Sequence, residues 1–257
     1  MTTASTTTGT AGDTAGAGQQ SLRGRTVVLI GGSSGIGLQT ARRARAEGAD
    51  VVLAGRDPDR LRQAAAEVGA RSSAAFDATD AASLGAFFGA LPSPVDHVLV
   101  TAGGPYYAPF DTMDLDDARR HVADGIGLVL AVARHAAATV RPGGALLFMG
   151  GTGARRPGHG ISIAAALTAA LPALVANLAL EIAPVRVNLI AAGFVDTPLS
   201  ATILGDALDR RREQLRTTLP IGRVVGPDDV AALALHLMTN PALTGATFDI
   251  DGGQQLV

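Results

Sequence analysis

The sequence contains no cysteine, no tryptophan and no lysine, so all 21 of its basic residues are arginines. Without cysteine the chain forms no disulfide bond, thiolate nucleophile or thiolate metal site. Its two tyrosines are neighbours, Tyr106 and Tyr107. With no lysine anywhere in the sequence, neither tyrosine can be paired with a lysine at any spacing.

A large excess of one charge is also missing. The chain has 23 acidic residues against its 21 basic ones, for a formal net charge of −2. No basic block is present that would neutralise many phosphates, which argues against a nucleic-acid partner. No histidine has neighbours at metal-ligand spacing, so no metal site is predicted. We expect a small-molecule substrate instead.

The N-terminal segment has neither a basic stretch nor an apolar stretch of the kind found in secretory signals. Its Thr, Ala, Gly and Gln residues cannot bury enough apolar surface to offset the entropy of ordering. We therefore predict a disordered tail over residues 1–21, one domain over residues 22–257, and a cytoplasmic location.

Long uncharged runs are rare here, but residues 161–180 read ISIAAALTAALPALVANLAL. This length reaches the roughly 20 residues that a membrane-spanning helix needs. Thr168, Pro172 and Asn177 weaken that interpretation, and the run lies between two apolar strand-like segments. We predict a crossover helix of the fold and no membrane association.

Short apolar runs alternate with helix-forming segments along the whole chain after residue 21. The predicted strands lie within residues 26–30, 51–57, 71–80, 95–104, 143–151, 185–193 and 244–253. Such alternation is typical of a parallel α/β sheet with crossover helices. We predict a single-domain, Rossmann-like, doubly wound parallel sheet of about seven strands with helices on both faces.

A glycine-rich turn, GGSSGIG, separates the first predicted strand from the first predicted helix. In this position glycines let the backbone approach a pyrophosphate, which binds to free amides at the positive end of the helix. The predicted contacts of this turn with a dinucleotide are Gly31, Ser33, Ser34, Gly35, Ile36 and Gly37.

The end of the second strand predicts which dinucleotide binds. An acidic residue there accepts hydrogen bonds from ribose hydroxyls, whereas an arginine pairs with a 2′-phosphate. The chain has Gly55 and Arg56 at this point, which favours NADP(H). The alternative is an arginine in a turn that is solvated or occupied by Asp57.

Several further segments recur in a fixed order: DATD after the third strand, TAGG after the fourth, LALE at the end of the uncharged run, VRVNLIAAGFVDTP, and DGG. With the glycine turn, they make residues 22–257 resemble the short-chain dehydrogenase/reductase family. The resemblance implies that Asp77 meets the adenine, that Ala102 and Gly103 flank the adenosine ribose, and that Thr197 contacts the nicotinamide amide or phosphates. It also implies a homodimer or homotetramer built through the long helices.

The same resemblance shows what is missing. Members of the family usually reduce a carbonyl with a tyrosine, a lysine, a serine and an asparagine. Counting back from LALE, the tyrosine and lysine positions hold Ala164 and Thr168, and the serine position holds Gly151. The best match to the asparagine position is Asp124. The usual mechanism therefore does not carry over.

Three hypotheses remain for the function. The first is an NADPH-dependent reductase of an imine or iminium, or of another activated C=N, C=O or C=C bond, with an unusual proton supply. The second is a catalytically silent protein that binds NADP(H) as a sensor or partner subunit. The third is a non-redox enzyme that uses the same pocket for shape selection.

Four side chains are candidate replacements for the missing catalytic groups: His159, Tyr106, Tyr107 and Asp124. Each also has a structural interpretation. The histidine is equally typical of a surface loop, the tyrosines of a lid wall or a subunit contact, and Asp124 of a solvated helix face paired with Arg120. The predicted substrate pocket consists of Gly151, Thr152, Ala164, Thr168 and Phe194.

Overall fold

The computed structural model describes residues 21–257, so the predicted tail over residues 1–21 falls almost entirely outside the described residues. The chain forms one sheet of seven parallel strands in the order β3-β2-β1-β4-β5-β6-β7. The predicted doubly wound α/β fold is confirmed.

The elements alternate as the sequence predicts. The strands are β1 (Thr26–Ile30), β2 (Asp50–Gly55), β3 (Ser72–Ala75), β4 (Val95–Val100), β5 (Val140–Gly151), β6 (Arg186–Ala192) and β7 (Thr247–Ile250). The helices are α1 (Gly35–Ala46), α2 (Pro58–Val68), α3 (Ala81–Gly89), α4 (Leu115–Thr139), α5 (Ser162–Glu181), α6 (Pro198–Leu204), α7 (Leu208–Thr218) and α8 (Pro227–Thr239). Short 3₁₀ turns are η1 (Gly153–Arg155), η2 (Gly205–Ala207) and η3 (Gln254–Leu256).

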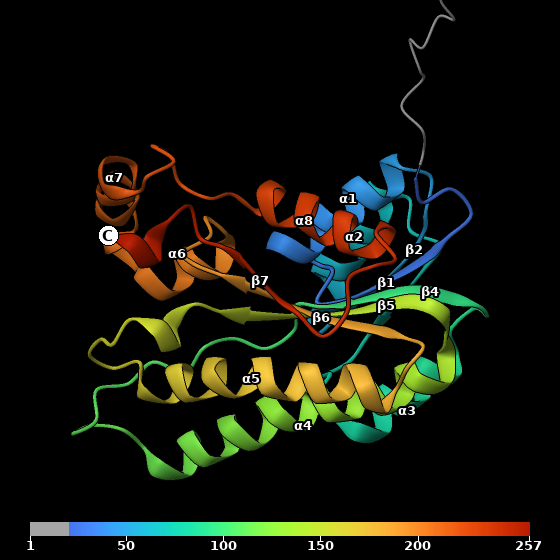
Figure 1. Ribbon diagram of the computed structural model, residues 1–257, viewed down its shortest axis with the longest axis horizontal. Coiled ribbons are helices and arrows are strands. Elements are labelled where there is room, and N and C mark those ends of the chain that lie inside the picture. The colour runs from blue at the N-terminus through green and yellow to red at the C-terminus, as the bar shows by residue number, and fades with distance from the viewer. Residues whose placement is uncertain (1–20) are drawn as a thin grey trace, which may run out of the picture.

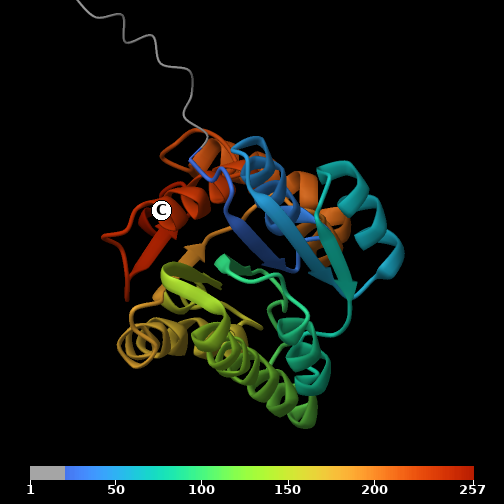
Figure 2. The same ribbon diagram turned by 90° about the vertical axis from the view of Figure 1, so that its right-hand side faces the viewer.

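Helices cover both faces of the sheet (Figures 1 and 2). One apolar core joins the sheet to α1, α2 and α8, and a second core joins it to α3, α4 and α5. Every residue of β1 and of β4 is buried, as expected for central parallel strands covered on both faces. Burial on both faces explains why these strands are nearly uniform apolar runs.

The uncharged run forms α5, the crossover helix between β5 and β6. By length and composition, α4 and α5 are the two helices of residues 21–257 that meet the criterion for a membrane span. Both pack on the sheet, and α5 buries Leu171, Val175 and Leu178 in the core. The prediction of a crossover helix is therefore confirmed.

Aspartates fix where three helices begin. The carboxylates of Asp57, Asp80 and Asp114 accept hydrogen bonds from first-turn amides of α2, α3 and α4 respectively. Such capping satisfies amides that have no partner within the helix. The long helix α4 therefore begins directly after Asp114.

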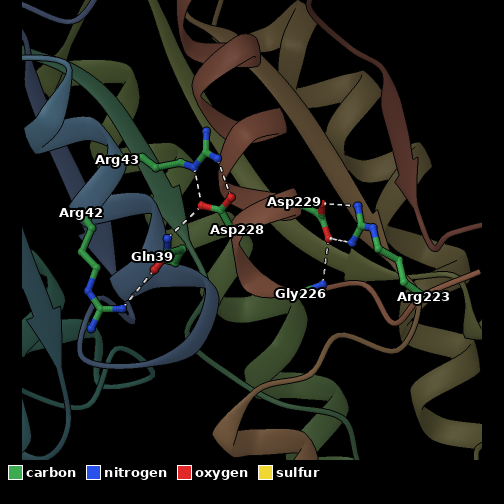
Figure 3. Close-up of polar contacts among 7 residues, drawn as sticks. All are labelled: Gln39, Arg42, Arg43, Arg223, Gly226, Asp228 and Asp229. Carbon is green, nitrogen blue, oxygen red and sulfur yellow. Dashed lines mark hydrogen bonds and ion pairs between the residues drawn. The ribbon is translucent and has the colours of Figure 1, made fainter. Parts of the chain in front are cut away.

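Helices α1 and α8 lie side by side and are joined by ion pairs (Figure 3). Asp228, in the first turn of α8, accepts hydrogen bonds from Arg43 Nε and Nη2 at 2.5 Å and from Gln39 Nε2 at 2.9 Å. Next to it, Asp229 pairs with Arg223 and accepts a hydrogen bond from the Gly226 amide at 2.9 Å. These contacts anchor the start of α8 to α1 and to the loop before it.

Replacing Asp228 by Asn tests how much these contacts contribute to the free energy of unfolding. Hydrogen bonds from Arg43 and Gln39 lower the pKa of Asp228 from 3.8 to about 2. The carboxylate therefore stabilises the fold above pH 3.8, and this contribution is lost as the pH falls through 2. Because the side chain is 56% exposed, we expect Asp228→Asn to lower the free energy of unfolding by less than about 1 kcal/mol. Urea unfolding at pH 7 and at pH 2 measures the loss in free energy of unfolding at each pH. A loss at pH 2 equal to the loss at pH 7 would contradict this account.

Candidate active site

The turn after β1 brings three backbone segments into contact. The amides of Gly31 and Gly32 both donate to the Ala54 carbonyl of β2 at 2.9 Å. A Cβ atom on Gly31, whose φ is +101°, would lie 2.5 Å from Thr101 Oγ1, and one on Gly37 would lie 2.3 Å from the Gly31 carbonyl oxygen. Only glycine fits these two positions, so β1, α1 and the end of β4 meet here.

The start of α1 is open to an anion. The first amide to bond within this helix is that of Leu38, which donates to the Ser34 carbonyl at 3.2 Å. The amides of Gly35, Ile36 and Gly37 therefore lack a helical partner, and the Ser34 side chain makes no capping hydrogen bond within the described residues. No acidic residue lies in the first turn. This cradle fits the pyrophosphate of a dinucleotide.

The end of β4 faces this cradle. The amides of Thr101 and Ala102 both donate to the Ile30 carbonyl, at 2.8 and 3.0 Å, and Thr101 Oγ1 donates to the Gly31 carbonyl at 3.0 Å. Gly103 follows with a φ of +96°. The structure thus places Ala102 and Gly103 beside the glycine turn at the point where the strand order reverses, which is where such sheets bind ligands.

The turn after β6 reaches the same place. A Cβ on Gly35 would lie 3.5 Å from Thr197 Cβ. Thr197 caps α6, and its hydroxyl accepts a hydrogen bond from the Ser200 amide at 3.3 Å. Residues far apart in the sequence therefore converge beside the start of α1: the glycine turn, Ala102 and Thr197.

Arg56 is exposed at the end of β2 and takes part in no ion pair within residues 21–257. Its neighbour Asp57 turns to α2, where it accepts hydrogen bonds from the Asp59 and Arg60 amides at 3.0 Å and pairs with Arg60 at 3.3 Å. The alternative that Asp57 occupies Arg56 is therefore wrong.

Asp77, predicted to meet the adenine, lies on the exposed turn after β3. Hydrogen bonds from the Thr79 amide and hydroxyl lower the pKa of this carboxyl, and the charge of Arg56 lowers it further. Arg56 therefore lies close enough to Asp77 for its charge to act on this carboxyl.

The substrate side begins at the end of β5. A Cβ on Gly151 would lie 3.3 Å from Thr168 Cγ2 of α5, so the predicted serine and lysine positions are neighbours in space. Thr168 Oγ1 donates to the Ala165 carbonyl at 3.0 Å, and Thr152 is buried with its amide donating to Ala192. Ala164 is half-buried on the same helix. None of these side chains is acidic or basic.

Two loops close the outer side of this region. The Ala108 amide donates to the Gly160 carbonyl at 2.9 Å, which joins the loop after β4 to the loop before α5. Both loops lie on the same side of the molecule as α6 and α7 (Figure 1). They carry Tyr107, which is 52% exposed, and the exposed His159. Partial burial raises the pKa of Tyr107, so its phenol keeps its proton at neutral pH.

The other two candidates have structural contacts or face outward. Tyr106 donates to the Asp114 carbonyl at 3.3 Å, and its ring lies 5.5 Å from that of His121. Asp124 is exposed in the middle of α4. Arg120 pairs with Asp117 instead of Asp124, so the alternative of an ion pair between Arg120 and Asp124 is wrong. Tyr107 and His159 are left as the ionisable candidates of the two loops.

A contact that the sequence did not reveal lies after β6. Gln254 Oε1 accepts a hydrogen bond from the Phe194 amide at 2.9 Å, and a Cβ on Gly193 would lie 2.7 Å from the same oxygen. Asp251 holds this C-terminal segment by accepting hydrogen bonds from the Gly253 and Gln255 amides. The DGG motif marks the segment, but no pattern in the sequence shows that the following glutamine reaches Phe194.

Comparison with known proteins agrees with this geometry. Residues 31–255 match a family model described as enoyl-(acyl carrier protein) reductase. Galactitol 2-dehydrogenase (L-tagatose-forming) of Cereibacter sphaeroides is 34% identical, over 90% of this chain and 95% of that protein. The chain belongs to the short-chain dehydrogenase/reductase family.

Two solved structures of the family bear on the chemistry. The reductase/Diels-Alderase MalC of Malbranchea aurantiaca superposes with a TM-score of 0.84 at 26% identity, covering 93% of this chain and 99% of that one. A small-chain dehydrogenase in complex with NADPH superposes with a TM-score of 0.78 at 27% identity, covering 91% and 99%. The fold of this chain is therefore shared with a relative that binds NADPH, which supports NADP(H) as the cofactor.

No group of three or more His, Cys, Asp or Glu side chains suited to a metal ion occurs in the part of the chain that the structure describes.

The close approach at Gly37 leads to a prediction. We expect Gly37→Ala to destabilise the fold by about 1–3 kcal/mol, because the added methyl would overlap the Gly31 carbonyl. Gly89→Ala is the matched control, since nothing lies within 4 Å of a Cβ there, and should change stability by at most about 1 kcal/mol. Chemical denaturation measures both, and equal stability of the two variants would refute the steric argument.

Proposed function

We propose that this chain is an NADP(H)-dependent reductase and that its substrate is an iminium, which needs no proton donor of the usual kind. The observation that carries the proposal is a contrast within one cleft. The glycine cradle is complete at Gly31 and Gly37, while the positions beside it that should hold acid and base are Ala164, Thr168 and Gly151.

The cofactor side is built from the residues already described. The amides of Gly35 and Ile36 would hold the pyrophosphate, Ala102 and Gly103 would flank the adenosine ribose, and Arg56 would pair with a 2′-phosphate. Thr197, next to Gly35, would contact the nicotinamide amide or phosphates. When bound, NADPH supplies a hydride.

An iminium suits a cleft without a strong acid. Reduction of a ketone creates an alkoxide that has to be protonated, which usually requires an activated donor. Hydride addition to an iminium carbon moves the C=N electron pair onto nitrogen and yields a neutral amine without a proton transfer. The chain then has only to bind, orient and shield the substrate, for which Tyr107, His159 and Phe194 are the candidate side chains.

A relative's activity supports this proposal and also a second one. MalC is described as both a reductase and a Diels-Alderase, and it covers nearly the whole of this chain. A cleft with no acid or base is compatible with a non-redox reaction governed by shape, which stays the second candidate. A silent NADP(H)-binding sensor or partner subunit is the third.

We also propose a homodimer or homotetramer. The outward face of α5 is apolar over its middle turns, with exposed residues Ala166, Ala169, Ala170, Ala173 and Leu180, and its exposed polar residues are Ser162, Asn177 and Glu181. The exposed Leu130 lies on the adjacent α4. A second copy would bury both helices. The cytoplasmic location stays a prediction.

Arg56→Gln tests the cofactor assignment. Losing a charged hydrogen bond should weaken NADPH binding by about 10- to 100-fold and leave NADH binding unchanged. Arg60→Gln is the control, because Arg60 lies on the same surface but pairs with Asp57. Fluorescence titration measures both cofactors. A wild-type preference for NADH would exclude the role given to Arg56.

Substrate protonation tests the iminium proposal. A cyclic imine loses its proton as the pH rises, so its reduction rate should fall in step with its own titration. An N-methylated iminium keeps its charge, and its rate should stay constant between about pH 6 and pH 9. NADPH oxidation at 340 nm follows both reactions.

Two variants distinguish reduction of an iminium without a proton donor from reduction that uses a conventional side-chain proton donor. Tyr107→Phe and His159→Gln should each change the rate on the N-methylated iminium by less than about threefold. If the protein reduces a ketone and the Tyr107→Phe variant loses that activity, the proposal is contradicted. Tight NADPH binding without oxidation on any imine, ketone or enone would favour the sensor.

A further inference from the structure

A second polar site lies at the opposite edge of the sheet, where the strands begin. A cavity of about 220 Å³ is lined there by Arg25, His97, Arg141 and Arg186, among others. These residues stand at or near the starts of β1, β4, β5 and β6, which are neighbours in the sheet. Figure 2 views the molecule from this side. The cavity is therefore separate from the dinucleotide cleft.

The charges around this cavity do not balance. Asp96 is buried and accepts hydrogen bonds from the Thr26 amide at 2.8 Å and from Arg25 Nη1 at 3.1 Å. Arg141 Nε lies 2.5 Å from the same carboxylate. Within residues 21–257, Asp96 is the one carboxylate that forms ion pairs with these arginines. The single negative charge of Asp96 is therefore shared by two guanidinium groups.

Arg186 adds a third positive charge. It is 6% exposed, and its guanidinium donates to the carbonyls of Gly143, Leu237, Met238 and Leu243. Carbonyl oxygens satisfy its hydrogen bonds but carry no net charge. Arg186 therefore leaves the lining of the cavity with two positive charges in excess.

His97 supplies an unused polar group at the same place. The residue is 4% exposed, and its Nδ1 is enclosed without a hydrogen-bond partner in the described part of the chain. Burial lowers the pKa of His97 to about 3, so the ring is neutral at physiological pH. Buried polar atoms usually have partners, which makes an unpartnered ring beside an arginine-lined cavity a sign of a missing ligand.

We propose that this cavity binds a small oxyanion, a phosphate, sulfate or carboxylate group, held by Arg25, Arg141 and an N–H of His97. Guanidinium groups match the geometry of such anions and bind them through charge-assisted hydrogen bonds. A water takes up about 30 Å³ of liquid, so a cavity of this size has room for an anion of several atoms. An anion also offsets the excess positive charge, which is most costly at the buried Arg186, whereas the side chains of Arg25 and Arg141 are 41% and 34% exposed.

Thermal unfolding of the full chain tests the proposal. Sodium phosphate is titrated against sodium chloride at equal ionic strength, with saturating NADPH to occupy the dinucleotide cleft. A ligand that binds only the folded state raises Tm, and at several times Kd we expect a saturable rise of about 2–4 °C with phosphate alone. Methyl phosphate is the second probe. Binding of methyl phosphate would indicate that the ligand is a phosphate group on a larger molecule. Failure of methyl phosphate to bind would indicate that the ligand is a free inorganic anion.

Arg141→Gln is the test variant and Arg71→Gln the matched control. Arg71 is an exposed arginine paired with Asp50 at the same amino edge of the sheet, before β3 and outside the lining of the cavity. We expect Arg141→Gln to weaken the phosphate response at least tenfold and Arg71→Gln to leave it unchanged. Equal responses to phosphate and chloride, or an undiminished response in Arg141→Gln, would overturn the proposal.

Histidine-selective NMR gives a readout that does not depend on stability. The imidazole signals of His97, assigned by their absence in His97→Gln, should shift as phosphate is added, while those of the exposed His159 stay fixed. Phosphate-dependent stabilisation without any shift of the His97 signals would place the anion elsewhere and overturn the proposal.

Discussion

The close approach of β1, α1 and β4 at the reversal of strand order is the constraint on which the site depends. Gly31 and Gly37 leave no room for a side chain, and Thr101 fastens the end of β4 to the turn through the Gly31 carbonyl. Because the three backbones meet, the first-turn amides of α1 lie beside the end of β4, at the place where such sheets bind a dinucleotide.

The chemistry of the cleft is determined by what stands next to that cradle. Thr168 donates its only hydroxyl proton to the backbone of its own helix, so it offers little to a substrate. The ionisable candidates on the substrate side, Tyr107 and His159, lie on two loops joined between Ala108 and Gly160. Under the proposed function, the site binds and orients a substrate that carries its own positive charge.

The two edges of the sheet are both suited to anions, for different reasons. At the carboxyl edge, backbone amides and a helix dipole create a site whose partner is a pyrophosphate. At the amino edge, Arg25, Arg141 and Arg186 gather around a single carboxylate, Asp96. The absence of lysine matters in both places, since guanidinium groups favour planar, bidentate contacts over a point charge.

The sequence by itself determined the fold class, the order of elements, the glycine turn and the loss of the Tyr-x-x-x-Lys pair. These depend on local periodicity, on glycine and on residue counts, all of which are properties of neighbouring positions. Tertiary structure alone decided that Asp57 caps α2 and leaves Arg56 without an ion pair, that Arg120 pairs with Asp117, and that Gln254 reaches Phe194. It also brought Arg25, His97, Arg141 and Arg186 to one cavity. Each of these contacts depends on which of several reachable partners a side chain meets once distant segments are packed, and a linear pattern does not contain that information.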